Sequence, residues 1–171
     1  MKLTIVINGK GGVGKDTLCR FAAERYRTEN VSSITPIKEI ASLCGWQGEK
    51  TDRARKFLSD LKALTAEYND FPTNYLAERY RAFLSSDGEL LFVHIREPEE
   101  IRKFVNATGG NAKTLLIRGG DRFDRTAYGN ASDDGVEDYP YDFVFVNDRP
   151  LEETREAFLA FLDGIVGRRA D

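Results

Sequence analysis

Short apolar runs alternate with longer amphipathic stretches along this chain. Runs rich in β-branched and aromatic residues predict strands; they cover residues 3–8, 31–35, 90–96, 114–118 and 143–147. Stretches with apolar residues at helical spacing predict helices between them; they cover residues 15–27, 36–43, 51–68, 72–84, 98–106 and 151–165. The alternation of strand and helix predicts a parallel sheet that is covered on both faces.

Two of the predicted helices have a well-marked apolar pattern. The helix that Thr51 or Asp52 caps has its apolar positions at Ala54, Phe57, Leu58, Leu61, Leu64 and Tyr68. The helix that Pro72 opens is expected to turn inward the side chains of Leu76, Tyr80, Phe83 and Leu84. Both helices are therefore expected to be amphipathic.

The expected fold is a three-layer α/β sandwich around a parallel sheet of about five strands, formed by a single domain over residues 1–171. In such sheets, ligands bind beyond the carboxyl ends of the strands. This arrangement places residues 8–14, Arg96, Arg118 and Asn147 along one edge, although they lie far apart in the sequence. A ligand site is therefore expected at this edge.

The charge balance excludes some partners. The 171 residues are 41% hydrophobic and 31% charged, which suits a folded chain and argues against disorder. With 25 basic and 28 acidic side chains, the formal net charge is −3, and this provides no electrostatic footprint for nucleic acid or an anionic membrane. Cys19 and Cys44 lack metal-ligand spacing and a disulfide-rich context. We therefore expect a cytoplasmic protein.

The first predicted strand runs into a glycine-rich segment that reads Gly-Lys-Gly-Gly-Val-Gly-Lys over residues 9–15. It fits the P-loop pattern G-x-x-x-x-G-K, between a strand and a helix as that motif requires. Glycines let backbone amides turn toward phosphates, the helix start adds a positive dipole end, and the lysine balances the β- and γ-phosphate charges. A plain glycine turn is the alternative. We expect ATP to bind here through Gly9, Lys10, Gly11, Gly12, Val13, Gly14, Lys15, Asp16 and Thr17.

Asp16 stands where this motif usually has serine or threonine. A hydroxyl at that position ligates Mg²⁺, and a carboxylate can also serve as a hard oxygen ligand. Without a cation, the carboxylate would repel the triphosphate. Thr17 could supply a hydroxyl instead, although one further step along the helix turns it by about 100°. We therefore expect Mg²⁺ as a cofactor, with Asp16 as its ligand and Thr17 as the alternative.

Two families share parts of this loop. Lys-Gly-Gly-Val-Gly-Lys at 10–15 resembles the deviant Walker A motif of the ATPases that partition DNA and place division sites, in which the first lysine acts across a dimer. Gly-Lys-Asp at 14–16 resembles phosphomevalonate kinase and the phage-type deoxynucleoside monophosphate kinases. Segments 35–41, 130–137 and 141–143 are similar to the second group. This second resemblance implies a P-loop kinase of the nucleoside monophosphate kinase type, with acceptor-binding helices over about 36–86 and a lid over about 118–138.

Arginines near the expected edge suit phosphoryl transfer, which consists mostly of positioning and charge neutralisation. Arg96 closes the third predicted strand and is expected to grip the acceptor phosphate; an ion pair with a following glutamate is the alternative. The resemblance implies that Arg118, Arg122 and Arg125 belong to the lid and clamp the transferring group; a solvated surface stripe is the alternative. The candidate catalytic residues are Lys15, Arg96, Arg118, Arg122 and Arg125.

We expect an enzyme, a Mg·ATP-dependent kinase that moves the γ-phosphoryl group to a small phosphorylated acceptor, with a (deoxy)nucleoside monophosphate first and phosphomevalonate second. A nucleotide-dependent dimeric ATPase switch that uses Lys10 is an alternative from another class. A binding module without turnover is a third, because the third strand closes with His94, Ile95 and Arg96 and carries no Walker B carboxylate. The expected partners are ATP and the acceptor, without nucleic acid or membrane, and the chain is expected to be a monomer or a homodimer.

Overall fold

The computed structural model describes residues 2–120 and 135–167. Within these residues the chain forms a five-stranded parallel sheet in the order β2-β3-β1-β4-β5. The strands are β1 (Leu3–Asn8), β2 (Thr28–Ser32), β3 (Leu90–His94), β4 (Ala112–Gly119) and β5 (Phe143–Asn147). The nearly continuous apolar runs of β1 and β3 suit strands that are buried on both faces. The predicted parallel sheet is confirmed, and β1 lies at its centre.

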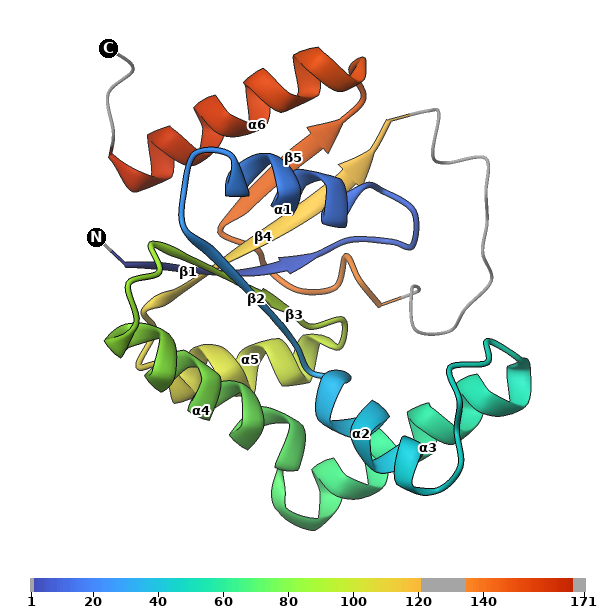
Figure 1. The fold of residues 1–171 in the computed structure, drawn as a ribbon. Helices are drawn as coiled ribbons and strands as arrows, with labels where there is room; N and C mark the ends of the chain where they lie inside the picture. The colour runs from blue at the N-terminus through green and yellow to red at the C-terminus, as the bar shows by residue number, and fades with distance from the viewer. Residues whose placement is uncertain (1, 121–134, 168–171) are drawn as a thin grey trace.

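Helices cover both faces of this sheet. The described helices are α1 (Lys15–Ala23), α2 (Thr35–Leu43), α3 (Asp52–Asn69), α4 (Phe71–Ser85), α5 (Pro98–Ala107) and α6 (Leu151–Val166). Figure 1 shows α1 and α6 on one face, α4 and α5 on the other, and α2 and α3 extending past the sheet. The predicted three-layer α/β sandwich is therefore confirmed. Among the helices that the structure describes, none combines the length and apolar content needed to cross a membrane.

A separate core fills each of the two interfaces between sheet and helices. On one face, Phe92 of β3 packs in a buried cluster with Leu18 of α1 and Phe158 of α6. On the other, the neighbouring Val93 joins Phe83 of α4 in a second cluster. Successive residues of β3 thus serve opposite faces, as the alternation of side chains along a strand requires. Burial on both sides fixes the register of the central strands, and with it the positions of the segments that follow them.

Several boundaries differ from the prediction. Helix α1 ends at Ala23 rather than residue 27, because the amides of Glu24 and Arg25 bond only three residues back, to the Phe21 and Ala22 carbonyls, and tighten the last turn. Strand β2 begins at Thr28 rather than at residue 31, and its first three residues pair with β3. These three residues are polar and lie on an edge strand, where polar side chains can contact solvent. A search for apolar runs therefore does not detect them.

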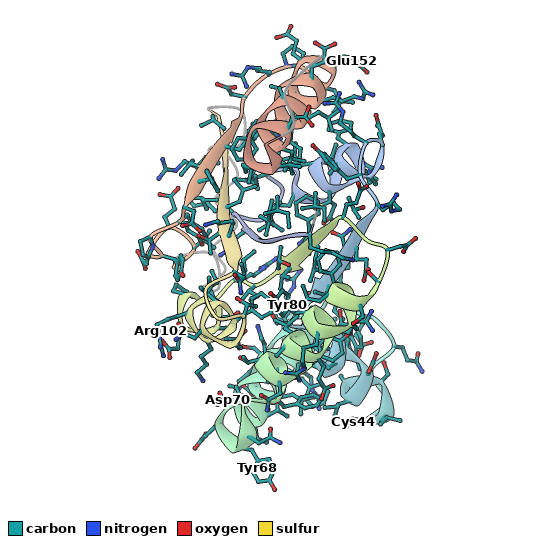
Figure 2. The ribbon with its side chains drawn as sticks, turned by 90° about the vertical axis from the view of Figure 1, so that its left-hand side faces the viewer. Cys44, Tyr68, Asp70, Tyr80, Arg102 and Glu152 are labelled. Atoms are coloured by element: carbon teal, nitrogen blue, oxygen red, sulfur yellow. The ribbon has the colours of Figure 1, made fainter. Side chains whose placement is uncertain are left out.

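The apolar pattern of α3 is wider than the surface that it buries. Thr51 caps this helix as predicted, accepting a hydrogen bond from the Ala54 amide at 3.2 Å. However, Phe57, Leu64 and Tyr68 are 37%, 64% and 85% exposed. Figure 2 shows Tyr68 at the end of the helical extension, pointing away from the sheet. In α4, Leu76 and Phe83 are buried as predicted, whereas Leu84 is 46% exposed and its predicted inward orientation is wrong.

Candidate functional site

The P-loop, residues 9–15, joins the central strand to α1. Gly9 fits against β4, since a Cβ atom there would lie 2.6 Å from the Ile117 carbonyl oxygen. Gly14 has a φ of 90°, a conformation that favours glycine, and precedes the first residue of α1. The segment is therefore a compact turn that leads directly into a helix N-terminus, which is the geometry that binds phosphate groups.

Lys15 folds back over the P-loop. Its Nζ donates to the Gly9 carbonyl at 2.6 Å and to the Lys10 carbonyl at 3.1 Å. The ammonium group is thereby held beside the loop backbone. A negatively charged phosphate placed in the loop could exchange with these carbonyls as the partner of the lysine.

Asn8 is a buried connection between three segments and is only 1% exposed. Its Oδ1 accepts a hydrogen bond from the Gly9 amide at 2.9 Å, at the start of the P-loop. Its Nδ2 donates to the Arg96 carbonyl at 3.0 Å and to the Tyr141 hydroxyl at 2.8 Å. Tyr141 in turn donates to the Val136 carbonyl at 2.6 Å. One amide therefore fixes the P-loop relative to the end of β3 and to residues 136–141.

The predicted edge is confirmed. Asn8, the P-loop, Arg96 and Asn147 lie together, because Asn8 bonds to Arg96 and the Asn147 side chain donates to the Val13 carbonyl at 2.9 Å. Sequence reasoning placed both asparagines at the edge but did not identify these bonds. A polar residue at the carboxyl end of a buried strand is the signal that could have indicated these hydrogen bonds, since a buried amide needs partners.

Two of the four candidate arginines, Arg96 and Arg118, lie within the described residues. Arg96 is exposed just beyond β3; the next glutamates contact other residues, since Glu97 pairs with Lys62 and Glu99 pairs with Arg102. Arg118 extends from β4, and its Nε donates to Glu137 at 3.1 Å. Both side chains of this pair are about half exposed, so the bond is weak and a phosphate could replace the glutamate. Arg122, Arg125, Asp133 and Asp134 lie outside the described residues.

Asp16 suits a cation that is shared with a nucleotide. It is exposed in the first turn of α1, where the helix dipole favours a negative charge. Within residues 2–120 and 135–167, no three His, Cys, Asp or Glu side chains cluster closely enough to hold a metal ion by themselves. Mg²⁺ normally keeps several waters and takes one or two carboxylates together with phosphate oxygens. The residues therefore fit Mg²⁺ delivered with ATP, and Asp16 would hold it from the protein side.

His94 has a partner within the sheet. Its Nε2 lies 3.1 Å from the Asn30 Oδ1 of β2. Burial lowers the pKa of His94; the nearby Asp16 charge raises it and the Lys15 charge lowers it. The imidazole is therefore neutral at pH 7 and links the edge strand β2 to β3. This contact gives His94 a structural role between the two strands.

A buried ion cluster joins α3 to α5. Lys62 is 8% exposed, and its Nζ lies 2.7 Å from Glu97 Oε2 and 2.9 Å from Glu100 Oε2. Burial tends to raise the pKa of Glu97, but the charge and hydrogen bond of Lys62 outweigh it and the pKa is lowered. Burial and the charge of Glu97 raise the pKa of Glu100. The helix of the expected acceptor region is thereby attached to the segment that follows Arg96.

Solved structures share this fold. A sugar kinase from a Janibacter species has a TM-score of 0.56 at 17% identity, with 100% of each chain covered. The tunicamycin resistance protein of Deinococcus radiodurans has a TM-score of 0.56 at 15% identity, covering 95% of this chain and 96% of that one. Shikimate kinase from Bacteroides thetaiotaomicron has a TM-score of 0.52 at 17% identity, covering 96% and 98%. No family model and no curated protein matches the sequence. The chain therefore shares the three-layer α/β fold of these proteins, which include a sugar kinase and a shikimate kinase.

Proposed function

We propose that this protein is a Mg·ATP-dependent phosphotransferase that moves the γ-phosphoryl group to a small phosphorylated acceptor, with a (deoxy)nucleoside monophosphate as the first candidate. The observation that carries the proposal is the position of the Arg96 backbone beside the P-loop, since Asn8 bonds to the Arg96 carbonyl and to the Gly9 amide. A loop with the geometry for phosphate groups, close to an exposed arginine whose guanidinium would hold a second phosphate, would supply the positioning that this reaction needs.

In this proposed reaction, each residue of the site has a defined role. The P-loop amides and Lys15 would bind the β- and γ-phosphates, and Asp16 would hold the Mg²⁺ that neutralises their charge. Arg96 would orient the acceptor so that its phosphate oxygen attacks the γ-phosphorus, while the bond to the β–γ bridging oxygen breaks and ADP leaves. An acceptor phosphate is already ionised at neutral pH, so the step needs no catalytic base. Arg118, with Arg122 and Arg125, would stabilise the charge of the transferring group.

An acceptor panel tests this proposal. The full chain is incubated with Mg·ATP, and ADP formation is measured for each deoxynucleoside and ribonucleoside monophosphate and for phosphomevalonate. Sugars and shikimate are included, because the proteins of similar fold include a sugar kinase and a shikimate kinase. We expect a monophosphate to raise ADP formation well above the rate with ATP alone. A Lys15→Ala variant serves as the control for contaminating kinases.

The same samples separate the kinase from a nucleotide-dependent switch. If ATP drives dimerisation, Lys10→Ala abolishes that dimerisation and no acceptor stimulates turnover, then the kinase proposal is wrong and the switch is correct. If ATP binds but neither an acceptor nor dimerisation has an effect, the chain is a nucleotide-binding module. The three functions therefore give three distinct results.

A further inference from the structure

Asn147, the last residue of β5, connects the edge of the sheet to the P-loop. Its Nδ2 donates to the Val13 carbonyl at 2.9 Å. Its Oδ1 lies 3.2 Å from the hydroxyl of Thr154, which is buried in α6. That hydroxyl also lies 3.1 Å from the Arg149 carbonyl, so its single hydrogen is shared between two acceptors. The amide is therefore held on both sides.

The amide satisfies both contacts at this position because it carries a donor and an acceptor. The Val13 carbonyl can only accept a hydrogen bond, so it requires the NH₂ side of Asn147. The Thr154 hydroxyl can donate to the amide oxygen, which keeps the side chain from flipping. An aspartate has the same shape but offers only acceptors, and would place two oxygens against each other at the Val13 carbonyl.

The contact with Val13 also determines the direction of the next amide. The Val13 carbonyl and the Gly14 N–H belong to one planar trans peptide group, so they point in opposite directions. A carbonyl held by Asn147 turns the Gly14 N–H away from Asn147. The fit is close, because a Cβ atom on Gly14 would lie 2.8 Å from Asn147 Nδ2. Asn147 therefore packs directly against the peptide group that it orients.

We propose that Asn147 is a positioning residue of the P-loop, which holds the Val13–Gly14 peptide so that the Gly14 N–H is presented to the phosphate chain of the nucleotide, with Thr154 keeping the amide in the required orientation. This inference rests on phosphate binding by the P-loop in the proposed function and is independent of the acceptor. It assigns a role in nucleotide binding to two residues, one in β5 and one in α6, that lie more than 100 residues from the loop in the sequence.

Selective labelling gives a direct view of this peptide. The sequence contains two Val–Gly pairs, Val13–Gly14 and Val166–Gly167. A protein labelled with carbonyl-¹³C valine and ¹⁵N glycine thus shows two amide signals in a carbonyl-filtered spectrum. Gly167, at the end of α6, is the internal control. Inorganic tripolyphosphate is titrated with Mg²⁺ present, and we expect the Gly14 signal to shift strongly and the Gly167 signal to stay in place.

Asn147→Ala should weaken tripolyphosphate binding by about five- to tenfold, the effect of one lost hydrogen bond, and should reduce the Gly14 shift at saturation. Thr154→Val should act in the same direction but more weakly. The double variant should resemble Asn147→Ala, because the hydroxyl acts through the amide. Asn147→Asp should bind more weakly than Asn147→Ala, since it adds repulsion. Asn106→Ala, on the exposed surface of α5, is the matched control and should behave as wild type.

The outcomes are distinguishable. If the wild type binds tripolyphosphate and Asn147→Ala binds it equally well, the inference is wrong while the proposed function stands. If Asn147→Ala loses affinity but its Gly14 signal moves as in the wild type, Asn147 does not orient this peptide and the inference is again wrong. If the wild type itself binds neither tripolyphosphate nor ATP, the phosphate site and the proposed function both fail, and this inference fails with them.

Discussion

Replacement of Lys62 by methionine leaves the carboxylates of Glu97 and Glu100 without the ammonium group that lies 2.7 and 2.9 Å from them. Loss of one partner from a buried ion pair costs about 3–5 kcal/mol. The Glu97 side chain is 45% exposed and can regain water, so we expect a smaller loss, about 2–3 kcal/mol of unfolding free energy at pH 7. In a domain of this size, that loss lowers Tm by about 5–10 °C.

Urea and thermal unfolding of Lys62→Met measure this loss, and Lys56→Met is the matched control. Lys56 lies on the same helix, is exposed, and pairs with Asp60 one turn away. Loss of such an exposed pair changes stability by less than about 0.5 kcal/mol. Because α3 belongs to the proposed acceptor region, Lys62→Met should also raise the KM for the acceptor more than the KM for ATP. Equal stability of the two methionine variants would show that Lys62 does not stabilise the fold through these carboxylates.

The pH dependence gives a second check with a defined sign. In the wild type, Lys62 lowers the pKa of Glu97, so the stability from this pair is present above the unfolded pKa and is lost as the pH falls through the folded pKa. Without Lys62, burial and mutual repulsion raise the pKa of both carboxylates. The difference in unfolding free energy between the wild type and Lys62→Met should therefore shrink between pH 7 and pH 4, as the carboxylates take up protons. A difference that stays constant over this range contradicts the electrostatic explanation. Adding Glu100→Gln to Lys62→Met should recover part of the lost stability.

Three further predictions concern the P-loop and the cysteines. Lys15→Ala should lower turnover by about 10²–10³-fold without changing the unfolding midpoint, whereas Lys10→Ala should have a moderate effect that does not depend on dimerisation; ADP formation and urea unfolding measure both. Asp16→Asn should weaken ATP binding with Mg²⁺ and strengthen it without Mg²⁺, as measured by calorimetric titration, and equal losses under both conditions would contradict a role as metal ligand. A thiol reagent should label the exposed Cys44 in the native protein and Cys19 only after unfolding, because burial raises the pKa of Cys19 to about 12; equal native rates would contradict this.

The parts of the fold that depend on neighbours in sequence could be predicted. The P-loop follows β1 at Asn8 and leads into α1 at Lys15, as the motif indicates, and β5 spans the predicted residues 143–147. These elements have strong local signals: β-branched or aromatic runs, glycines that stop them, and an amphipathic pattern in the helix that follows. A local pattern is sufficient where one short segment determines its own conformation.

The parts that depend on distant partners could not be predicted. Lys62 is buried beside its partner Glu97, which lies 35 residues away in the sequence. Helical periodicity alone assigns such a lysine to solvent, because it contains no information about this distant partner. The bond between Asn147 and Val13 joins residues 134 positions apart. On α3, apolar residues continue around the helix beyond the side that packs on α2 and α4, so the pattern predicts the helix but not which part of its apolar arc is covered. Only the tertiary arrangement supplies this information.

The central position of β1 means that the two halves of the site differ in how easily they open. β1 lies between β3 and β4 and has five consecutive residues, Thr4 to Asn8, that are at most 4% exposed, so the strand that carries the P-loop belongs to the last part of the molecule to unfold. In contrast, α2 and α3 extend past the sheet (Figure 1), and Leu43 and Leu64 are exposed on them. Because the P-loop is carried by the central strand, melting of these helices is expected to leave the loop in place. Under the proposed function, a molecule in this partly melted state would still bind ATP but would have lost the helices proposed to hold the acceptor.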